Sequence, residues 1–222
     1  MENHAFVDSV IKEIVQPGVD ALMQTRYFAE LREGKLSKKR LQGFAVQHYL
    51  HNIALVKGLV LCMAKNAANG DLYEHFREQF NEEQYHPELA KKFGFALGLT
   101  EADFEEATPV FECLAHTSAV IRGMFLGTPA ETRTGALVNE SMVCRYSEEF
   151  NTHLRRHYGL DDKARQFFTV HAVADVEHTK SAAEVVARYA TTPKEQKLVR
   201  ESAHNMVAFK IAKFDGIYRA YG

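Results

Sequence analysis

Residues 171–178 read His-Ala-Val-Ala-Asp-Val-Glu-His. An α-helix advances by about 100° per residue, so His171, Asp175 and His178 lie at about 0°, 40° and −20° around its axis. Three strong metal ligands therefore share one narrow stripe of a helix, with alanine and valine between them. This stretch predicts an inward-facing metal site in a helical protein. Core histidines and an ion-paired Asp175 are the alternative.

A second cluster of metal ligands lies far upstream, where Glu83 and His86 are separated by two residues and share one helical face. Inward-pointing Glu-x-x-His pairs recur in the di-iron carboxylate sites of helical bundles. Glu82 also has helical spacing to His86, so the identity of the carboxylate ligand stays open. A solvated acidic face is the alternative for both glutamates.

Glu140 lies in a largely apolar stretch, residues 136–144. A buried carboxylate is costly unless it is paired or bound to a metal, so Glu140 is the third candidate cluster. Mixed carboxylate and imidazole coordination with open positions is typical of non-haem iron oxygenases. The predicted metal ligands are Glu83, His86, Glu140, His171, Asp175 and His178.

Three further residues are candidates for binding a substrate. His48 precedes an aromatic residue in a predicted helix, Lys57 has apolar neighbours, and Arg145 follows Glu140 by five residues and suits a carboxylate. Core packing of His48, an extended Lys57 side chain that reaches solvent and an ion pair at Arg145 are the respective alternatives.

The placement of proline, glycine and N-cap residues is helical throughout the chain. Thr-Pro pairs at 108–109, 128–129 and 192–193 are typical helix starts. Pro87 either kinks one helix or separates two shorter ones. No alternating segment bounded by hairpin turns is present, so we expect essentially no sheet. The predicted helices cover residues 4–15, 18–33, 37–67, 71–97, 101–107, 109–126, 129–158, 162–190 and 193–219.

Composition narrows the class of protein. The 222 residues carry a formal net charge of −2, which argues against nucleic acid as a partner. No uncharged apolar run approaches the length of about 18 residues that would span a membrane, and the charged N-terminus does not resemble a secretory signal. Three widely spaced cysteines suit free thiols in a reducing cytoplasm. We therefore expect a cytoplasmic all-α bundle of about seven main helices in a single domain, residues 1–222.

The chain resembles the haem-oxygenase-like di-metal oxidase and oxygenase superfamily, and the CADD-type proteins within it, with the TenA and PqqC-like group as more distant relatives. The most specific part of the resemblance is the His171 motif. Other matching stretches are Gly34 to Ser37, Gln47 to His51, Glu82-Glu83, His86 to Leu89 and Glu140-Ser141. The resemblance implies a haem-oxygenase-like fold, a homodimer, the six ligands above (with Glu82 as the alternative to Glu83) and O2 activation at two irons.

CADD-type p-aminobenzoate synthases consume one of their own tyrosines and take the amino group from a lysine. Phe28 and Phe150 stand at the corresponding positions here, with Tyr27 one residue away from the first. These differences argue against the self-sacrificing reaction.

The predicted function is a non-haem di-iron oxidase or oxygenase that uses O2 to modify a small amino-acid or carboxylic-acid substrate. Two Fe(II) ions are the expected cofactor, with manganese or a mixed-metal pair as alternatives. The competing functions are a metal-free enzyme of the PqqC or TenA kind and a non-catalytic helical interaction protein.

Overall fold

The computed structural model describes residues 3–222, apart from the side chains of residues 173–176. Its regular elements are helices, and no strand occurs in the described part of the chain, which confirms the predicted all-α class. In chain order they are α1 (His4–Val10), the π-helix η1 (Ile11–Val15), α2 (Gln16–Met23), α3 (Arg26–Arg32), α4 (Lys38–Lys65), α5 (Gly70–Glu83), α6 (His86–Ala96), α7 (Glu101–Glu105), α8 (Phe111–Leu126), α9 (Pro129–Tyr158), α10 (Gln166–Tyr189) and α11 (Pro193–Ala220).

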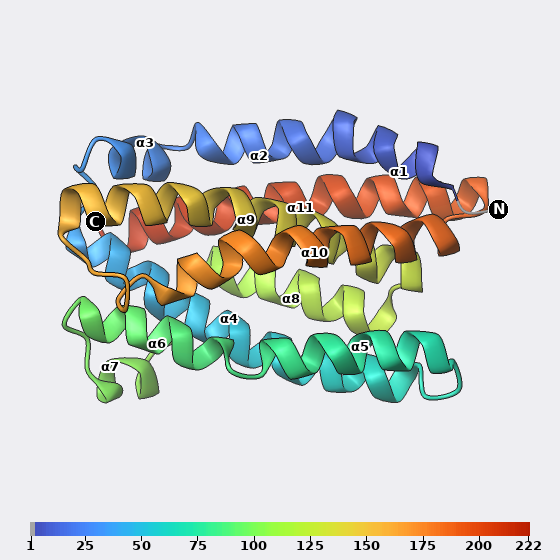
Figure 1. Ribbon diagram of the computed structural model, residues 1–222, viewed down its shortest axis with the longest axis horizontal. Helices are drawn as coiled ribbons and strands as arrows, with labels where there is room; N and C mark the ends of the chain where they lie inside the picture. Colours follow the sequence, from blue (N-terminus) through green and yellow to red (C-terminus); the bar gives the residue numbers. More distant parts are fainter. Residues whose placement is uncertain (1–2) are drawn as a thin grey trace.

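The long helices α4, α9, α10 and α11 run along the long axis of the molecule (Figure 1). Aromatic side chains from these helices fill the interior between them. The ring of Phe150 in α9 lies 4.3 Å from that of Phe168 in α10 and 4.9 Å from that of Phe44 in α4, measured between centroids. All three side chains are buried, and such offset aromatic pairs add to the free energy of apolar burial.

Two of the three Thr-Pro pairs begin helices as predicted. Thr128 caps α9, where its hydroxyl accepts the N–H of Glu131 and the Glu131 carboxylate accepts the N–H of Thr128. The third prediction is wrong, because α8 begins at Phe111 rather than at residue 109. The side chain of Gln47 donates to the carbonyl of Thr108 and accepts the N–H of Val110, which holds this segment extended.

The first predicted helix boundary is also wrong. The chain is continuously helical from α1 through η1 to the end of α2 at Met23, whereas the sequence suggested a break near residue 16. The π-helical turn lies directly before Pro17, and a widened turn relieves the clash between a proline ring and the carbonyl four residues earlier. The break falls instead at residues 24–25, where Thr25 adopts an extended conformation before α3.

Pro87 separates two helices rather than kinking one. Glu83 is the last residue of α5 and His86 is the first residue of α6, so the Glu-x-x-His pair spans the junction between them. α5 and α6 follow one another along one edge of the bundle (Figure 1). This junction is the local feature that places both side chains in the interior.

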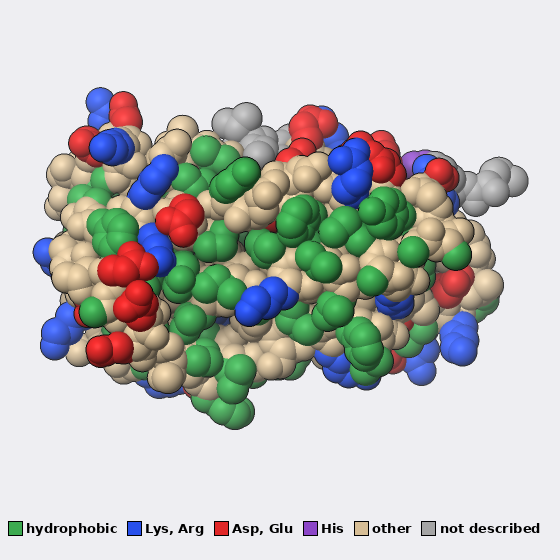
Figure 2. Space-filling model, turned by 90° about the horizontal axis from the view of Figure 1, so that it is seen from below, with side chains coloured by type: hydrophobic (Ala, Val, Ile, Leu, Met, Phe, Trp, Pro, Cys, Tyr) green, Lys and Arg blue, Asp and Glu red, His purple; other side chains and the backbone are tan. Residues whose placement is uncertain are grey.

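Apolar side chains are spread over the face seen in Figure 2, among scattered acidic and basic groups. Large exposed apolar residues include Leu61 in α4 and Phe111, Phe125 and Leu126 in α8. No helix in the described part of the chain has the length and hydropathy needed to cross a lipid bilayer.

Candidate metal centre

Three predicted ligands from three helices converge in the interior. Glu83 of α5, Glu140 of α9 and His178 of α10 each place one ligand atom within 4.8 Å of the other two. Glu83 and Glu140 are 4% and 5% exposed, so both carboxylates are withdrawn from bulk water. Two buried carboxylates this close repel each other and require positive charge nearby. The arrangement suits a bound cation.

Two more predicted ligands extend this group. Nδ1 of His86 lies 2.5 Å from Oε2 of Glu83 and 3.2 Å from Nε2 of His171. Burial alone would raise the pKa of the Glu83 carboxyl, but the hydrogen bond from His86 and the neighbouring imidazoles lower it below its usual value. Glu83 is therefore held in the ionised form that a metal ion requires.

The imidazole of His171 is oriented by its own helix. Its Nδ1 lies 2.7 Å from the carbonyl oxygen of Phe167, and its ring stacks on that of Phe167 at 4.1 Å between centroids. A carbonyl oxygen only accepts hydrogen bonds, so this contact assigns the proton to Nδ1. Nε2 is then left with its lone pair directed at the cluster. Such backbone contacts are the usual support of histidine ligands in metalloproteins.

The donor set fits iron. Carboxylate oxygens and imidazole nitrogens are the ligands used by non-haem iron enzymes, and no cysteine joins this group among the described residues. His86 contacts both the Glu83 carboxylate and His171, so five of the six predicted ligands lie in one cluster. The sixth, Asp175, is in α10, but its side chain lies outside the described residues.

The neighbouring glutamates have different environments. The side chain of Glu83 is 5% exposed and lies inside the cluster, whereas that of Glu82 is 57% exposed. Glu82 nevertheless reaches His178, with Oε2 2.9 Å from Nε2. Glu83 thus has the environment expected of a buried ligand, and Glu82 contacts the cluster from its exposed side.

His48 borders a small cavity beside the cluster, together with His51, Glu83, Glu140 and His171. Nζ of the buried Lys213 lies 3.2 Å from Nδ1 of His48. Burial and the Lys213 charge hold the pKa of His48 well below its usual range, and burial lowers the pKa of Lys213 to about 8. A set of neutral or weakly basic groups therefore faces the acidic cluster from α4 and α11.

The other two predicted substrate residues lie elsewhere. Lys57 is exposed on α4. The guanidinium of Arg145 is 42% exposed and pairs with Glu149, with 2.6 Å between Nη2 and Oε1. Neither borders the cavities that adjoin the cluster. Phe28 and Phe150 are fully buried in the aromatic core, and the Tyr27 hydroxyl donates to the Arg40 carbonyl at 3.2 Å.

Sequence reasoning missed Arg133 and Gln79. Arg133 precedes Glu140 by seven residues, which is two helical turns, so both side chains lie on the same face of α9. This spacing was the signal available. The Arg133 side chain is buried, and its Nη1 donates to Oε1 of Gln79 at 2.6 Å.

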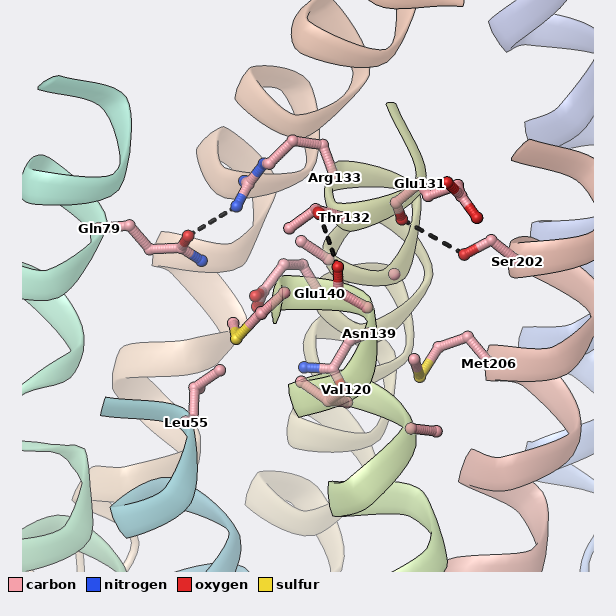
Figure 3. Close-up of a pocket in the computed structure, with 15 residues that line it drawn as sticks. Leu55, Gln79, Val120, Glu131, Thr132, Arg133, Asn139, Glu140, Ser202 and Met206 are labelled. Atoms are coloured by element: carbon pink, nitrogen blue, oxygen red, sulfur yellow. Dashed lines mark hydrogen bonds between the residues drawn. The ribbon is translucent and has the colours of Figure 1, made fainter. Parts of the chain in front are cut away.

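Arg133, Gln79 and Glu140 border a small cavity of about 50 Å³ between α5, α8, α9 and α11. Its remaining walls are largely apolar and include Leu55, Val120, Met124 and Met206. In Figure 3 the Arg133 and Gln79 side chains reach toward each other from α9 and α5, with Glu140 further along α9. An apolar cavity with a few convergent polar groups is the usual form of a small-molecule site.

Comparison with known proteins identifies the family. The family model described as iron-containing redox enzyme matches residues 42–210. The chain belongs to this family. The matched range includes Glu83, His86, Glu140, His171 and His178, so the whole cluster lies within the segment that matches the family model.

Proteins similar to this chain include 4-aminobenzoate synthases. The protein of that name from Nitrosomonas europaea is 25% identical over 224 residues, covering 91% of this chain and 90% of its own. The one from Chlamydia trachomatis serovar D is 27% identical, covering 72% of this chain and 71% of its own.

Solved structures confirm the haem-oxygenase-like fold. A domain of this fold from Shewanella denitrificans gives a TM-score of 0.84 at 16% identity, covering 93% of this chain and 90% of its own. A TenA homologue from Pyrococcus furiosus gives 0.79 at 17% identity, covering 96% and 99%. A CADD-like protein from Nostoc punctiforme gives 0.69 at 14% identity, covering 98% and 95%.

Proposed function

We propose that this protein is a non-haem di-iron oxidase or oxygenase that uses O2 to modify a small carboxylic acid or amino acid. The observation that carries the proposal is the convergence of Glu83, Glu140 and His178, with His86 and His171 adjoining them, in the interior of an iron-containing redox enzyme family member. The names of the 4-aminobenzoate synthase relatives are in keeping with an enzyme that yields a small aromatic acid.

Each part of the chain has a role in this proposal. Glu83, Glu140 and His178 hold metal, and His86 and His171 complete the donor set. The carbonyl of Phe167 keeps the His171 ring in the tautomer that offers Nε2. Iron, when bound, supplies the redox chemistry with O2.

The surroundings of the cluster serve the same reaction. The buried walls of the two adjoining cavities limit the access of water. His48 accepts a hydrogen bond from the Lys213 ammonium, or donates one to the neutral amine, and so can hold or pass a proton beside the carboxylates. The cavity bordered by Arg133 and Glu140 binds the substrate next to the metal.

Iron content is the decisive measurement. Metal-free protein is reconstituted with Fe(II) under anaerobic conditions, desalted and analysed for iron. We expect about two irons per chain, as in the di-iron carboxylate sites of helical bundles. Manganese and mixed-metal loading are measured in parallel. Less than one iron per chain contradicts the proposal and favours a metal-free enzyme, which the TenA-like fold also suits, or a non-catalytic interaction protein.

Two further measurements test the class of substrate and the oligomeric state. O2 uptake by the reconstituted protein is recorded against a panel of amino acids and carboxylic acids, with products identified by mass spectrometry. Absence of uptake with every acid and amino acid removes the oxygenase half of the proposal. We also propose a homodimer, and light scattering that gives a mass near 25.2 kDa, that of a single chain, contradicts it.

A further inference from the structure

The side chain of Arg133 is a buried cation without an anionic partner among the described residues. Arg133 is 2% exposed, and its Nη1 contact to the neutral Gln79 amide is 2.6 Å long. Its Nε is also buried and has no hydrogen-bond partner in the described structure. A buried guanidinium with an unused donor is costly to the fold, so a ligand that pairs with it is the natural explanation.

Arg133 and Gln79 occupy the boundary between two cavities. Both border the apolar cavity that contains Glu140, and both border a second, polar pocket lined by Glu82 and His178. A molecule bound in the apolar cavity therefore contacts the guanidinium at one end and lies close to the metal cluster. The guanidinium also lies over the ring of Phe76, with 5.8 Å between Cζ and the ring centroid.

The charges around the cavity limit what it accepts. Burial lowers the pKa of Arg133 to about 10, although the Glu140 and Glu83 charges counteract this, so the group stays cationic at neutral pH. Glu131 and Glu140 border the same cavity. A ligand with two negative charges, such as a phosphate monoester, is repelled by these carboxylates, whereas a single carboxylate is not penalised to the same extent.

We propose that Arg133 binds the carboxylate of a small acid whose apolar part fills the cavity between α5, α8, α9 and α11. The planar guanidinium offers paired N–H donors that match the two oxygens of a carboxylate. Leu55, Val120, Met124 and Met206 supply the apolar wall. The inference rests on the proposed function, because it names the substrate class of that same site, and it makes Arg133 a specificity-determining residue.

Calorimetry tests this proposal without turnover. Hexanoate, hexanamide and hexan-1-ol are titrated into protein loaded with Fe(II) under anaerobic conditions, and into metal-free protein so that binding to iron is separated from binding to Arg133. Wild-type protein is expected to bind hexanoate at least tenfold more tightly than hexanamide in both forms. A hydrogen bond to a charged group corresponds to a loss of roughly 10- to 100-fold when it is removed.

Two variants of Arg133 and one control variant locate the effect. Arg133→Met is expected to weaken hexanoate binding by about 10- to 100-fold and to leave hexan-1-ol binding within about twofold. Arg133→Lys keeps the positive charge but loses the paired N–H donors, so its affinity for hexanoate is expected to lie between those of the wild type and Arg133→Met. Arg155→Met removes an exposed arginine from the same helix and is expected to bind all three compounds as the wild type does.

The results that overturn the proposal are distinct from those that overturn the proposed function. Equal affinity for hexanoate and hexanamide, or no hexanoate binding by the wild type, overturns it even if Arg133→Met does not fold. A folded Arg133→Met variant that binds hexanoate normally also overturns it, and so does an equal loss of hexanoate binding in Arg155→Met. Iron content is measured on the same samples. Failure to load iron alongside Arg133-dependent binding removes the di-iron function and leaves the carboxylate site.

Discussion

Oε2 of Glu82 lies 2.9 Å from Nε2 of His178, while the adjacent Glu83 is turned into the cluster and contacts His86. The two glutamates are consecutive, yet the side chain of Glu82 is 57% exposed and that of Glu83 is 5% exposed. This difference separates their expected contributions to metal binding.

Glu83→Gln is expected to reduce iron loading from about two to about one or fewer per chain, because the variant loses a charged oxygen donor that the site needs. Glu82→Gln makes the same chemical change one residue earlier and is expected to retain most of its iron. Metal analysis after anaerobic reconstitution compares the pair. Greater loss of iron in Glu82→Gln than in Glu83→Gln contradicts the assignment of Glu83 as the ligand.

The histidines of α10 provide a second prediction. His171→Ala and His178→Ala each remove an imidazole from the cluster, so both are expected to lose iron and, with it, the stabilisation that metal gives to the folded state. Thermal unfolding with and without Fe(II) measures that stabilisation. His204→Ala, on the exposed face of α11, is the matched control and should resemble the wild type. Full iron in both α10 variants would show that the stripe does not bind metal.

Lys213 predicts a pH dependence of stability. Its pKa falls from 10.5 to about 8 in the folded protein, chiefly because of burial. Between about pH 8 and pH 10.5 the Lys213 amine is protonated in the unfolded chain and neutral in the folded chain. The free energy of unfolding therefore increases as the pH rises through this range. Below about pH 8 the buried charge is penalised in full.

The free energy of unfolding of Lys213→Met, relative to that of the wild type, should therefore be highest at pH 7. This difference should fall by up to about 3 kcal/mol by pH 10. Urea unfolding at each pH gives the difference. Lys197→Met, at a side chain of α11 that is 77% exposed, controls for the loss of one lysine from this helix. A difference between wild type and Lys213→Met that does not change with pH contradicts the prediction.

Phe150 tests the aromatic core. Phe150→Ala leaves a cavity among Phe28, Phe44 and Phe168 and is expected to lower the free energy of unfolding by roughly 3–5 kcal/mol. Phe111→Ala makes the same change at a side chain that is 78% exposed, and its effect should stay within about 0.5 kcal/mol. Denaturant unfolding followed by circular dichroism compares the two. Similar losses for both would contradict the packing described for Phe150.

Most of the helices, and the convergence of five of the six candidate ligands, follow from local rules in the sequence. Periodicity places His171 and His178 on one face of α10, and Thr-Pro pairs mark the starts of α9 and α11. The start of α8 was missed because the Gln47 side chain, 61 residues earlier in the chain, binds the carbonyl of Thr108. Such a contact depends on tertiary structure and leaves no local signal.

The residues that border the candidate substrate cavity were harder to predict, because their burial also depends on tertiary structure. Arg145 and Lys57 have suitable neighbours in sequence, but which side of a helix faces a cavity depends on how several helices pack. Arg133 lies between Thr132 and Thr134 and looks like a surface residue. Only the tertiary structure shows that Arg133 is buried and hydrogen-bonded to Gln79 of α5.

The break between α5 and α6 at Pro87 means that a bound metal would restrain the two helices relative to each other. Glu83 ends one helix and His86 begins the next, so a metal held by both side chains is a cross-link between two segments that are otherwise joined by only two residues. Loss of the metal removes that restraint and increases the conformational entropy of the junction, as opening any short covalent or coordinate link does. Amide hydrogens around residues 83–86 are therefore expected to exchange faster in metal-free protein, while those around Phe150 in the aromatic core of α9 keep their protection.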